Sequence, residues 1–386
     1  MGENEWTRVL LERRADAAFQ LAQKAEGLFI YAKVVVDFLT RRRQLAQHYF
    51  DALIAESSES NVHQDAALAP LDVLYTAVLE SAFPDIRTDR CLQAQMQDVL
   101  GCVAILQDHV SPRVLHSLVG IEVAAVELVV DYLRAIIIFD KTCKTSDAKI
   151  HPLHASFPQF LLDENRCMNK LFWVNSCAQN SRWAAACLST LNDPGLLQRN
   201  VCRLPDPLLH KDEVSDLSTR IKTYLPVHTG IQYACLHWAT HLCGSGSQDV
   251  SVLMQSLDKF CRERLLFWME ALSMIGRLDV AVTALINARD WHASHSSTQD
   301  DTYWLLNDAY RFVLEYYIPI NCCPEQIYIS ALTFAPSCVS ETSMLKWSIP
   351  LWLSEFIVNH AGDHACGYAR LPTTSTSCDF PQTDVA

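Results

Sequence analysis

Apolar residues recur at helical spacing along most of the chain. One such stripe ends before Pro84 and consists of Leu71, Leu74, Val78 and Ala82. Apolar positions that repeat every three to four residues indicate amphipathic helices with one buried face. The pattern predicts a mainly α-helical chain, with helices over residues 5–26, 28–39, 70–82, 97–106, 113–120, 122–135, 181–191, 213–224, 230–243, 248–274, 277–288 and 301–318.

One short segment has a different pattern. Residues 136–139 are β-branched and aromatic, which favours a strand. The polar residues 140–148 predict a turn, and a return strand begins at Ile150. Two helices precede the strands, and the first starts at Ser111-Pro112, a favourable N-cap followed by proline at the first helical position. Helix, turn, helix and a two-stranded wing predict a winged-helix domain.

Polar stretches without periodicity divide the chain. Residues 55–66 predict a linker, and the Ser/Thr/Pro-rich tail 359–386 is typical of disorder. We therefore predict a helical segment over residues 1–54, the winged-helix domain over 67–163 and an all-helical scaffold domain over 164–358. No fixed internal period supports an array of repeats.

Composition and charge narrow the function. Half of the 386 residues are hydrophobic, so the chain can bury a substantial core. The net charge of −13 argues against nucleic-acid and anionic-membrane partners, which attract surplus cations. The predicted recognition helix 122–134 has one arginine against Glu122, Glu127 and Asp131, so we expect it to pack against the protein rather than read DNA.

Cysteine usage and the N-terminus predict a cytoplasmic protein. The 15 cysteines are odd in number, and several lie in apolar stretches, which is typical of buried free thiols: Cys102, Cys187, Cys235 and Cys261. The sequence contains no Asn-x-Ser/Thr acceptor, and its first residues are too charged for a signal peptide. No apolar run approaches the roughly 18 residues of a membrane span.

Catalytic motifs are absent from the sequence. It has no GxxxxGK[ST] phosphate loop, GxSxG elbow or HExxH motif, so we predict no enzymatic activity and no cofactor. One segment carries metal-ligand residue types, namely Cys235, His237, His241 and Cys243. On a helix the two histidines share a face while both cysteines point away, so four ligands cannot converge on one zinc ion. We therefore predict core thiols, a surface histidine pair and no metal.

A series of short motifs resembles the region that follows the ATPase core in fungal NACHT proteins, which are NOD-like-receptor-type signal-transduction ATPases. The resemblance covers about residues 25–340 and rests on the order of its motifs, which include Gly27-Leu28-Phe29-Ile30-Tyr31-Ala32, Leu153-His154-Ala155-Ser156-Phe157, Gln232-Tyr233-Ala234-Cys235, Phe267-Trp268-Met269-Glu270 and Asp308-Ala309-Tyr310-Arg311-Phe312. It implies the end of an NTPase helical region, then a winged helix, then a helical superhelix.

The resemblance also implies a function. It suggests a non-enzymatic regulatory and scaffold segment that couples nucleotide state to a signalling surface. The alternative is a fragment of a complete ATP/GTP-dependent NTPase whose phosphate loop lies upstream. In the family, a winged-helix histidine senses the β-phosphate of ADP, and His154 occupies that position, although Leu153 and Ala155 replace the family's Met and Asp. The other interpretation is a histidine satisfied by neighbouring backbone.

The segment 25–40 is apolar on more than one helical face: Leu28, Phe29, Tyr31, Val34, Val35, Val36 and Phe38. A helix that is apolar nearly all round requires burial on several sides. We therefore expect either self-association or another protein partner at this segment, or its complete burial against the winged helix.

Overall fold

The computed structural model describes residues 14, 16–25, 27–42, 45–55, 68–139, 148–296 and 300–334. All of them belong to one unit, Met1–Pro336. The described part is mainly α-helical, and its sheet is a single two-stranded antiparallel hairpin, which confirms the predicted fold class. Nearly all of the predicted linker and turn, and the whole predicted tail, lie outside the described residues.

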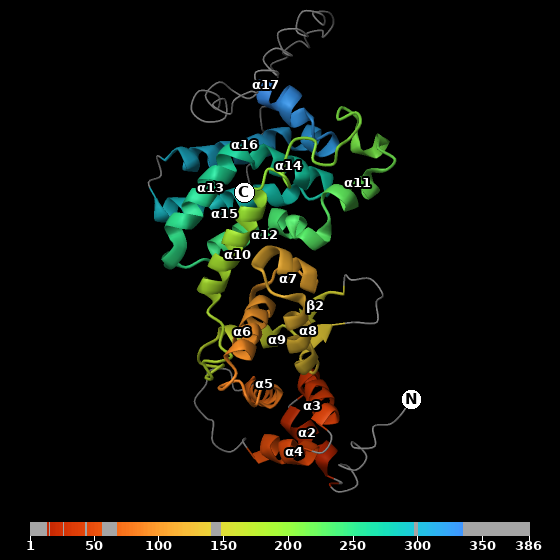
Figure 1. The fold of residues 1–386 in the computed structure, drawn as a ribbon, viewed down its shortest axis with the longest axis vertical. Helices are drawn as coiled ribbons and strands as arrows, with labels where there is room; N and C mark the ends of the chain where they lie inside the picture. The colour runs from red at the N-terminus through yellow and green to blue at the C-terminus, as the bar shows by residue number, and fades with distance from the viewer. Residues whose placement is uncertain are drawn as a thin grey trace, which may run out of the picture. The chain divides into compact units, whose positions relative to one another are not determined.

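Three helices near the N-terminus pack together: α2 (Ala17–Ala25), α3 (Phe29–Arg42) and α4 (Ala46–Ala55) (Figure 1). Of the predicted helix 5–26, residues 14 and 16–25 lie in the described ranges, and α2 occupies most of them. Gly27 separates α2 from α3 with a φ of 84°. Glycine adopts this left-handed conformation without the steric cost of a Cβ atom.

The predicted apolar helix, α3, is covered on one side only. Its contacts are with α2, α4 and the next helix, α5 (Ala69–Ala82). Tyr31, Val34 and Val35 are buried in this packing. Phe29 remains 80% exposed and Val36 50% exposed, so the expectation of complete burial is wrong. Phe29 and Val36 are seven residues apart and therefore share a face of α3, which remains exposed.

The next elements are in the order predicted for a winged helix. They are α5, α6 (Arg90–Ile105), α7 (Pro112–Val119), α8 (Val123–Tyr132), β1 (Ile137–Phe139), β2 (Ile150–Pro152) and α9 (Ser156–Leu162). Pro112 opens α7, and Gly120 ends it with a φ of 73°. Helix α8 packs against α6 and α7 through its buried valines, as expected for a packing helix.

Strand β2 is paired on both of its edges. On one side Ile138 lies opposite His151 in the antiparallel register with β1. On the other side Ile150 forms a bridge with Val110, and the Ile150 N–H donates to the Val110 carbonyl at 2.8 Å. The segment that precedes α7 therefore extends the wing, a pairing that the apolar pattern did not predict.

The rest of the described chain is a helical region. Its helices are α10 (Ser176–Leu191), η3 (Lys211–Glu213), α11 (Leu217–Tyr224), η4 (Val227–Thr229), α12 (Ile231–Cys243), η5 (Ser247–Asp249), α13 (Val250–Glu263), α14 (Leu265–Met274), α15 (Asp279–His295), α16 (Asp301–Cys322), the π-helix η6 (Ile327–Ala331) and α17 (Leu332–Phe334). The core contains three fully buried tryptophans, Trp183, Trp238 and Trp268.

Several of these helices differ from prediction. The predicted helix 213–224 begins only at Leu217, and the predicted helix 277–288 extends to His295. The expected single helix 248–274 is two helices, because the chain turns at Arg264, whose backbone is not helical. Helix α16 runs beyond the predicted end but has a non-helical residue at Tyr316. Pro319 explains this kink, because it lacks an N–H and its ring crowds the preceding turn.

The helical region directly contacts the predicted winged helix, which comprises α5 to α9. Helix α10 packs on α6 and α7, and η4 packs on α7. Arg182 of α10 forms an ion pair with Asp98 of α6 and donates to the Val119 carbonyl at 3.0 Å. The Ser117 hydroxyl donates to the Thr229 carbonyl at 2.7 Å. Polar contacts from α6 and α7 therefore fix the orientation of α10 and η4.

Candidate functional site

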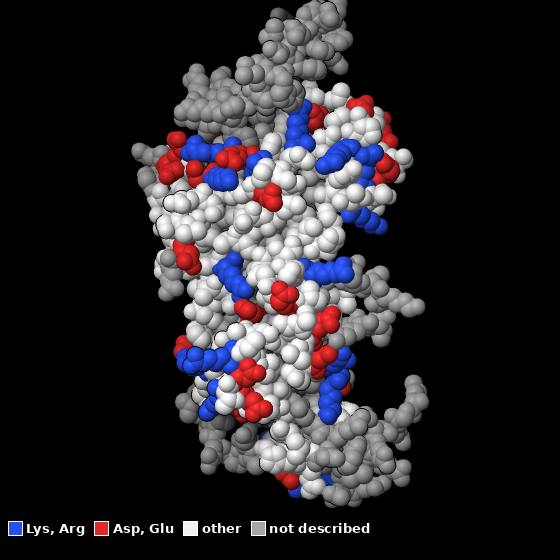
Figure 2. Space-filling model, in the orientation of Figure 1, with Lys and Arg blue, Asp and Glu red and all other residues white. Residues whose placement is uncertain are grey.

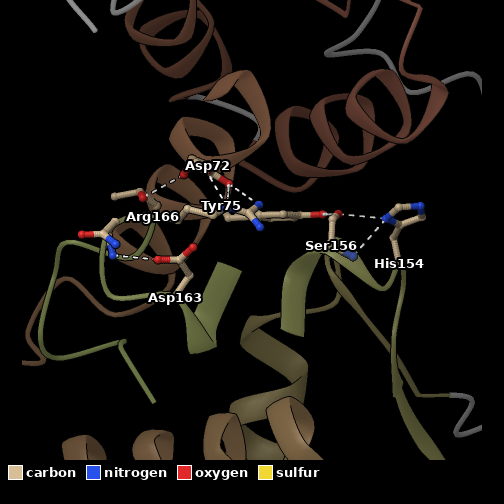
Figure 3. Close-up of polar contacts among 8 residues, drawn as sticks. Asp72, Tyr75, His154, Ser156, Asp163 and Arg166 are labelled. Atoms are coloured by element: carbon tan, nitrogen blue, oxygen red, sulfur yellow. Dashed lines mark hydrogen bonds and ion pairs between the residues drawn. The ribbon is translucent and has the colours of Figure 1, made fainter. Parts of the chain in front are cut away.

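His154, the residue predicted to sense nucleotide, lies between β2 and α9 and is exposed. Its Nδ1 atom is 2.8 Å from the Ser156 hydroxyl and also accepts the Ser156 backbone N–H at 3.2 Å. In Figure 3 the other ring nitrogen points away from Ser156. The Nδ1 side of the imidazole is thus held by Ser156, and Nε2 is directed away from that residue.

The contact continues into the core through Tyr75. Its hydroxyl lies 2.8 Å from Ser156 Oγ, although the two residues are 81 positions apart. Ser156 is 4% exposed and Tyr75 1% exposed. Burial raises the pKa of Tyr75, so the phenol stays protonated at neutral pH. The Ser156 hydroxyl therefore lies between a phenol and an imidazole.

An ion pair also holds α5, one turn before Tyr75. Arg166 donates to both carboxylate oxygens of Asp72, with a shortest distance of 2.7 Å (Figure 3). Both side chains are mostly buried, and hydrogen bonding to Asp72 raises the pKa of Arg166. Because Asp72 and Tyr75 are three residues apart, they share one face of α5. That face contacts the first residue of α9, Ser156, and Arg166, which follows α9.

The Cys/His segment on α12 differs in part from its prediction. His237 pairs with Asp108 at 2.7 Å, but His241 is fully buried, so the expected surface histidine pair is wrong. Cys235 is buried as predicted, whereas Cys243 is exposed and its thiol donates to the Asn287 carbonyl at 3.4 Å. Within the described ranges, no group of three or more His, Cys, Asp or Glu side chains could hold a metal ion.

His241 belongs to a buried polar chain that joins the two regions. Its Nδ1 atom lies 2.8 Å from Asn180 Oδ1, and its Nε2 atom lies 2.8 Å from the Tyr233 hydroxyl. The Gln107 backbone N–H donates to the same hydroxyl at 3.3 Å. Burial lowers the pKa of His241 to about 3, so the ring is neutral at physiological pH.

One buried carboxylate was not predicted from the sequence. Glu270 on α14 is 2% exposed and accepts the Val201 N–H at 2.9 Å and the Tyr328 O–H at 2.8 Å. Burial raises its pKa to about 7. An acidic residue inside the apolar run of α14 was the available signal, because carboxylates are rarely buried without partners.

Charges on the described surface are mixed in sign. Figure 2 shows basic side chains close to acidic ones, without a broad area of one sign on this face. Arg134, which follows α8, pairs with Asp131 at 2.6 Å. None of the helices in the described ranges is both long and apolar enough to span a bilayer.

The chain has a distant relative among known proteins. The vegetative incompatibility protein HET-E-1 of Podospora anserina is 31% identical to this chain over 204 residues. The alignment covers 51% of this chain but only 13% of the length of HET-E-1. No protein-family model matches the chain, and no solved structure matches it. The chain is therefore related to a fungal vegetative incompatibility protein, at a distance.

Proposed function

We propose that this chain is a regulatory and scaffold segment of a fungal NACHT-type, NOD-like-receptor signalling protein, and that it acts in the cytoplasm without enzymatic activity of its own. The similarity to HET-E-1 over half of the chain is the observation that carries this proposal. The winged helix supports it, because its contacts with α10 and η4 suit a segment that transmits a conformational change.

In this proposal His154 is the contact that registers nucleotide state. The ring has one nitrogen directed away from Ser156, and that nitrogen is the group that would meet a phosphate held by an ATPase core. Tyr75 and Ser156 hold the ring, and the Asp72–Arg166 pair fixes the same helix. A change in the contact at His154 would therefore reach α5 and the rest of the winged helix.

Calorimetry with ADP and with Mg-ATP tests the non-enzymatic part of the proposal. We expect neither nucleotide to bind residues 1–386 with micromolar affinity, because the sequence has no phosphate loop. Micromolar binding would contradict the proposal. The alternative, a fragment of a complete NTPase, is tested separately by the gene, where an in-frame GxxxxGK[ST] upstream of Met1 would support it.

We further propose that residues 25–40 bind a protein partner, including a second copy of this chain. The exposed Phe29 and Val36 on α3 carry this part. The variant Phe29→Asp/Val36→Asp should reduce association measured by light scattering at tens of micromolar. Ile318→Asp is the matched control, since Ile318 is also exposed, at 74%, but lies on α16. A strictly monomeric wild-type chain would rule out self-association.

A further inference from the structure

A pocket of about 130 Å³ lies where the wing meets the loop between α6 and α7. Its polar lining includes His109 from the loop and His151 from β2, together with Asp108 and Gln107. Pro158 of α9 also lines it, and its remaining walls are mostly apolar. A water molecule occupies about 30 Å³ in the liquid, so the pocket has room for a ligand of a few heavy atoms.

The strand pairing explains why the two histidines meet. Because Val110 bridges Ile150 in antiparallel register, the residues next to them, His109 and His151, fall directly opposite each other. Their rings stack with centroids 4.4 Å apart and planes inclined by 25°. Directly opposed side chains of like charge destabilise a strand pair, so the two imidazoles cannot both be protonated without cost.

The charged groups around this pair leave it without its own counter-ion. Burial, His151 and Lys149 all lower the pKa of His109, with burial the largest cause. Asp108 opposes them, but its carboxylate pairs with His237 of α12 at 2.7 Å. Two groups that can gain positive charge, His109 and His151, therefore line a pocket whose one lining carboxylate is engaged elsewhere, and Lys149 adds a positive charge near His109.

We propose that this pocket binds a free tetrahedral oxyanion of the size of inorganic phosphate or sulfate between His109 and His151, with the nearby charge of Lys149 favouring the anion. The anion supplies the missing negative charge and accepts N–H groups from both rings. At about 130 Å³ the pocket is too small to enclose a whole nucleotide. Bound there, the anion would cross-link the 107–110 loop to β2, and thereby strengthen the wing beside the Asp108–His237 contact with the helical region.

Binding and protonation are linked. An anion favours the protonated imidazoles, so it raises their pKa values, and by reciprocity it binds more tightly as the pH falls. Sulfate is the suitable probe, because its charge is constant from pH 5.5 to 8. We expect its affinity to be about tenfold higher at pH 6 than at pH 8.

NMR titration of the histidine ring protons, in sulfate and in chloride at matched ionic strength, tests the proposal. We expect 10 mM sulfate to raise the pKa values of His109 and His151 by about half a unit or more. His116, an exposed histidine on α7 beside Glu122, is the internal control and should not respond. Equal titrations in both salts, or the same shift at His116, would overturn the proposal.

Variants provide the second arm of the experiment. His151→Gln should abolish the effect of sulfate on His109, whereas His116→Gln should leave it unchanged. Phosphate should compete with sulfate at fixed pH. A sulfate response of His109 that survives His151→Gln would contradict a site built from the pair. Because the readout is a ring titration in this chain, it is independent of the proposed signalling function.

Discussion

The protonation state of single residues follows from their hydrogen-bond partners. A backbone N–H can only donate, so the contact from Ser156 N makes His154 Nδ1 an acceptor. The neutral ring then carries its proton on Nε2, the nitrogen that points away from Ser156. The Ser156 hydroxyl donates to Nδ1 and accepts from Tyr75, so the order of donation runs from the core to the surface.

This order predicts the tautomer of His154. Nitrogen-detected NMR should find the Nε2–H form dominant in the wild-type chain. Ser156→Ala should reduce that dominance, because the ring keeps only the weaker backbone contact, and Tyr75→Phe should have a smaller effect. His228, an exposed histidine in η4, is a reference ring. A dominant Nδ1–H form at His154 would contradict the assignment.

Two buried groups have opposite effects on stability as pH changes. The pKa of Glu270 is near 4.5 in the unfolded chain and about 7 in the folded protein. Its contribution to the free energy of unfolding is therefore complete below pH 4.5 and is lost as the pH rises through 7. The pKa of His241 is near 6.5 in the unfolded chain and about 3 in the folded protein. Its contribution to the free energy of unfolding is therefore complete above pH 6.5 and is lost as the pH falls towards 3. Between pH 4.5 and 6.5 the two residues change the free energy of unfolding with pH in opposite directions, and the two changes cancel.

Glu270→Gln should reveal how the free energy of unfolding depends on pH through His241 alone. The amide keeps an acceptor for Val201 and does not ionise, so the free energy of unfolding should rise with pH between 4.5 and 6.5 by about 1.4 kcal/mol per unit relative to wild type. Urea denaturation at several pH values measures it. Glu263→Gln, at a half-exposed position, is the control. A profile parallel to wild type would contradict the pKa assignment.

At the scale of elements, close approach and backbone conformation decide how helices meet. Gly230 links η4 to α12 with a φ of 77°, and a Cβ atom there would lie 2.5 Å from Leu118 Cγ on α7. Gly276 has a similar φ of 72°, but a Cβ atom there would meet nothing within 4 Å. The two glycines therefore share a conformational requirement and differ in crowding.

Gly230→Ala should therefore lower the free energy of unfolding more than Gly276→Ala does. The second substitution should lower the free energy of unfolding by about 1 kcal/mol, because alanine disfavours a positive φ. The first should cost about 1–3 kcal/mol more, because α7 and η4 must also separate. Thermal or urea denaturation measures the difference. Equal losses of stability would show that Leu118 can move aside without an energetic cost.

At the scale of the whole described unit, the winged helix and the helical region are joined by α10, α12 and η4. The buried chain Gln107–Tyr233–His241–Asn180 crosses this junction, and the Asp98–Arg182 ion pair lies on it. Because these contacts include buried polar groups, separating the two regions would leave donors and acceptors unpaired. We therefore expect the two regions to unfold together.

Cooperative unfolding can be measured because residues 67–163 contain no tryptophan. Eight of the nine tryptophans follow residue 163, so tryptophan fluorescence reports mainly the helical region. Hydrogen exchange of α6 amides reports the winged helix. Both should give the same free energy of unfolding. Arg182→Ala should lower both by about 1 kcal/mol. Arg134→Ala, which removes a similarly exposed pair within the winged helix, is the control. Separate transitions in the wild-type chain would contradict this coupling.

The sequence by itself determined the local elements. Pro112 and Gly120 bound α7, and the β-branched run before Asp140 became β1, because φ restriction and side-chain branching act on neighbouring residues. The apolar stripe of α5 likewise predicted its buried face. The candidate residue His154 could be located from its motif, although its role as a sensor is still a proposal.

Only the tertiary structure decided which surfaces cover one another. Helical spacing placed His237 and His241 on one face but could not show that Tyr233 and Asn180 would enclose the second histidine. The pairing of Tyr75 with Ser156 and the opposition of His109 and His151 join segments distant in sequence. Such contacts depend on how whole elements pack, and periodicity along one segment carries no information about its partners.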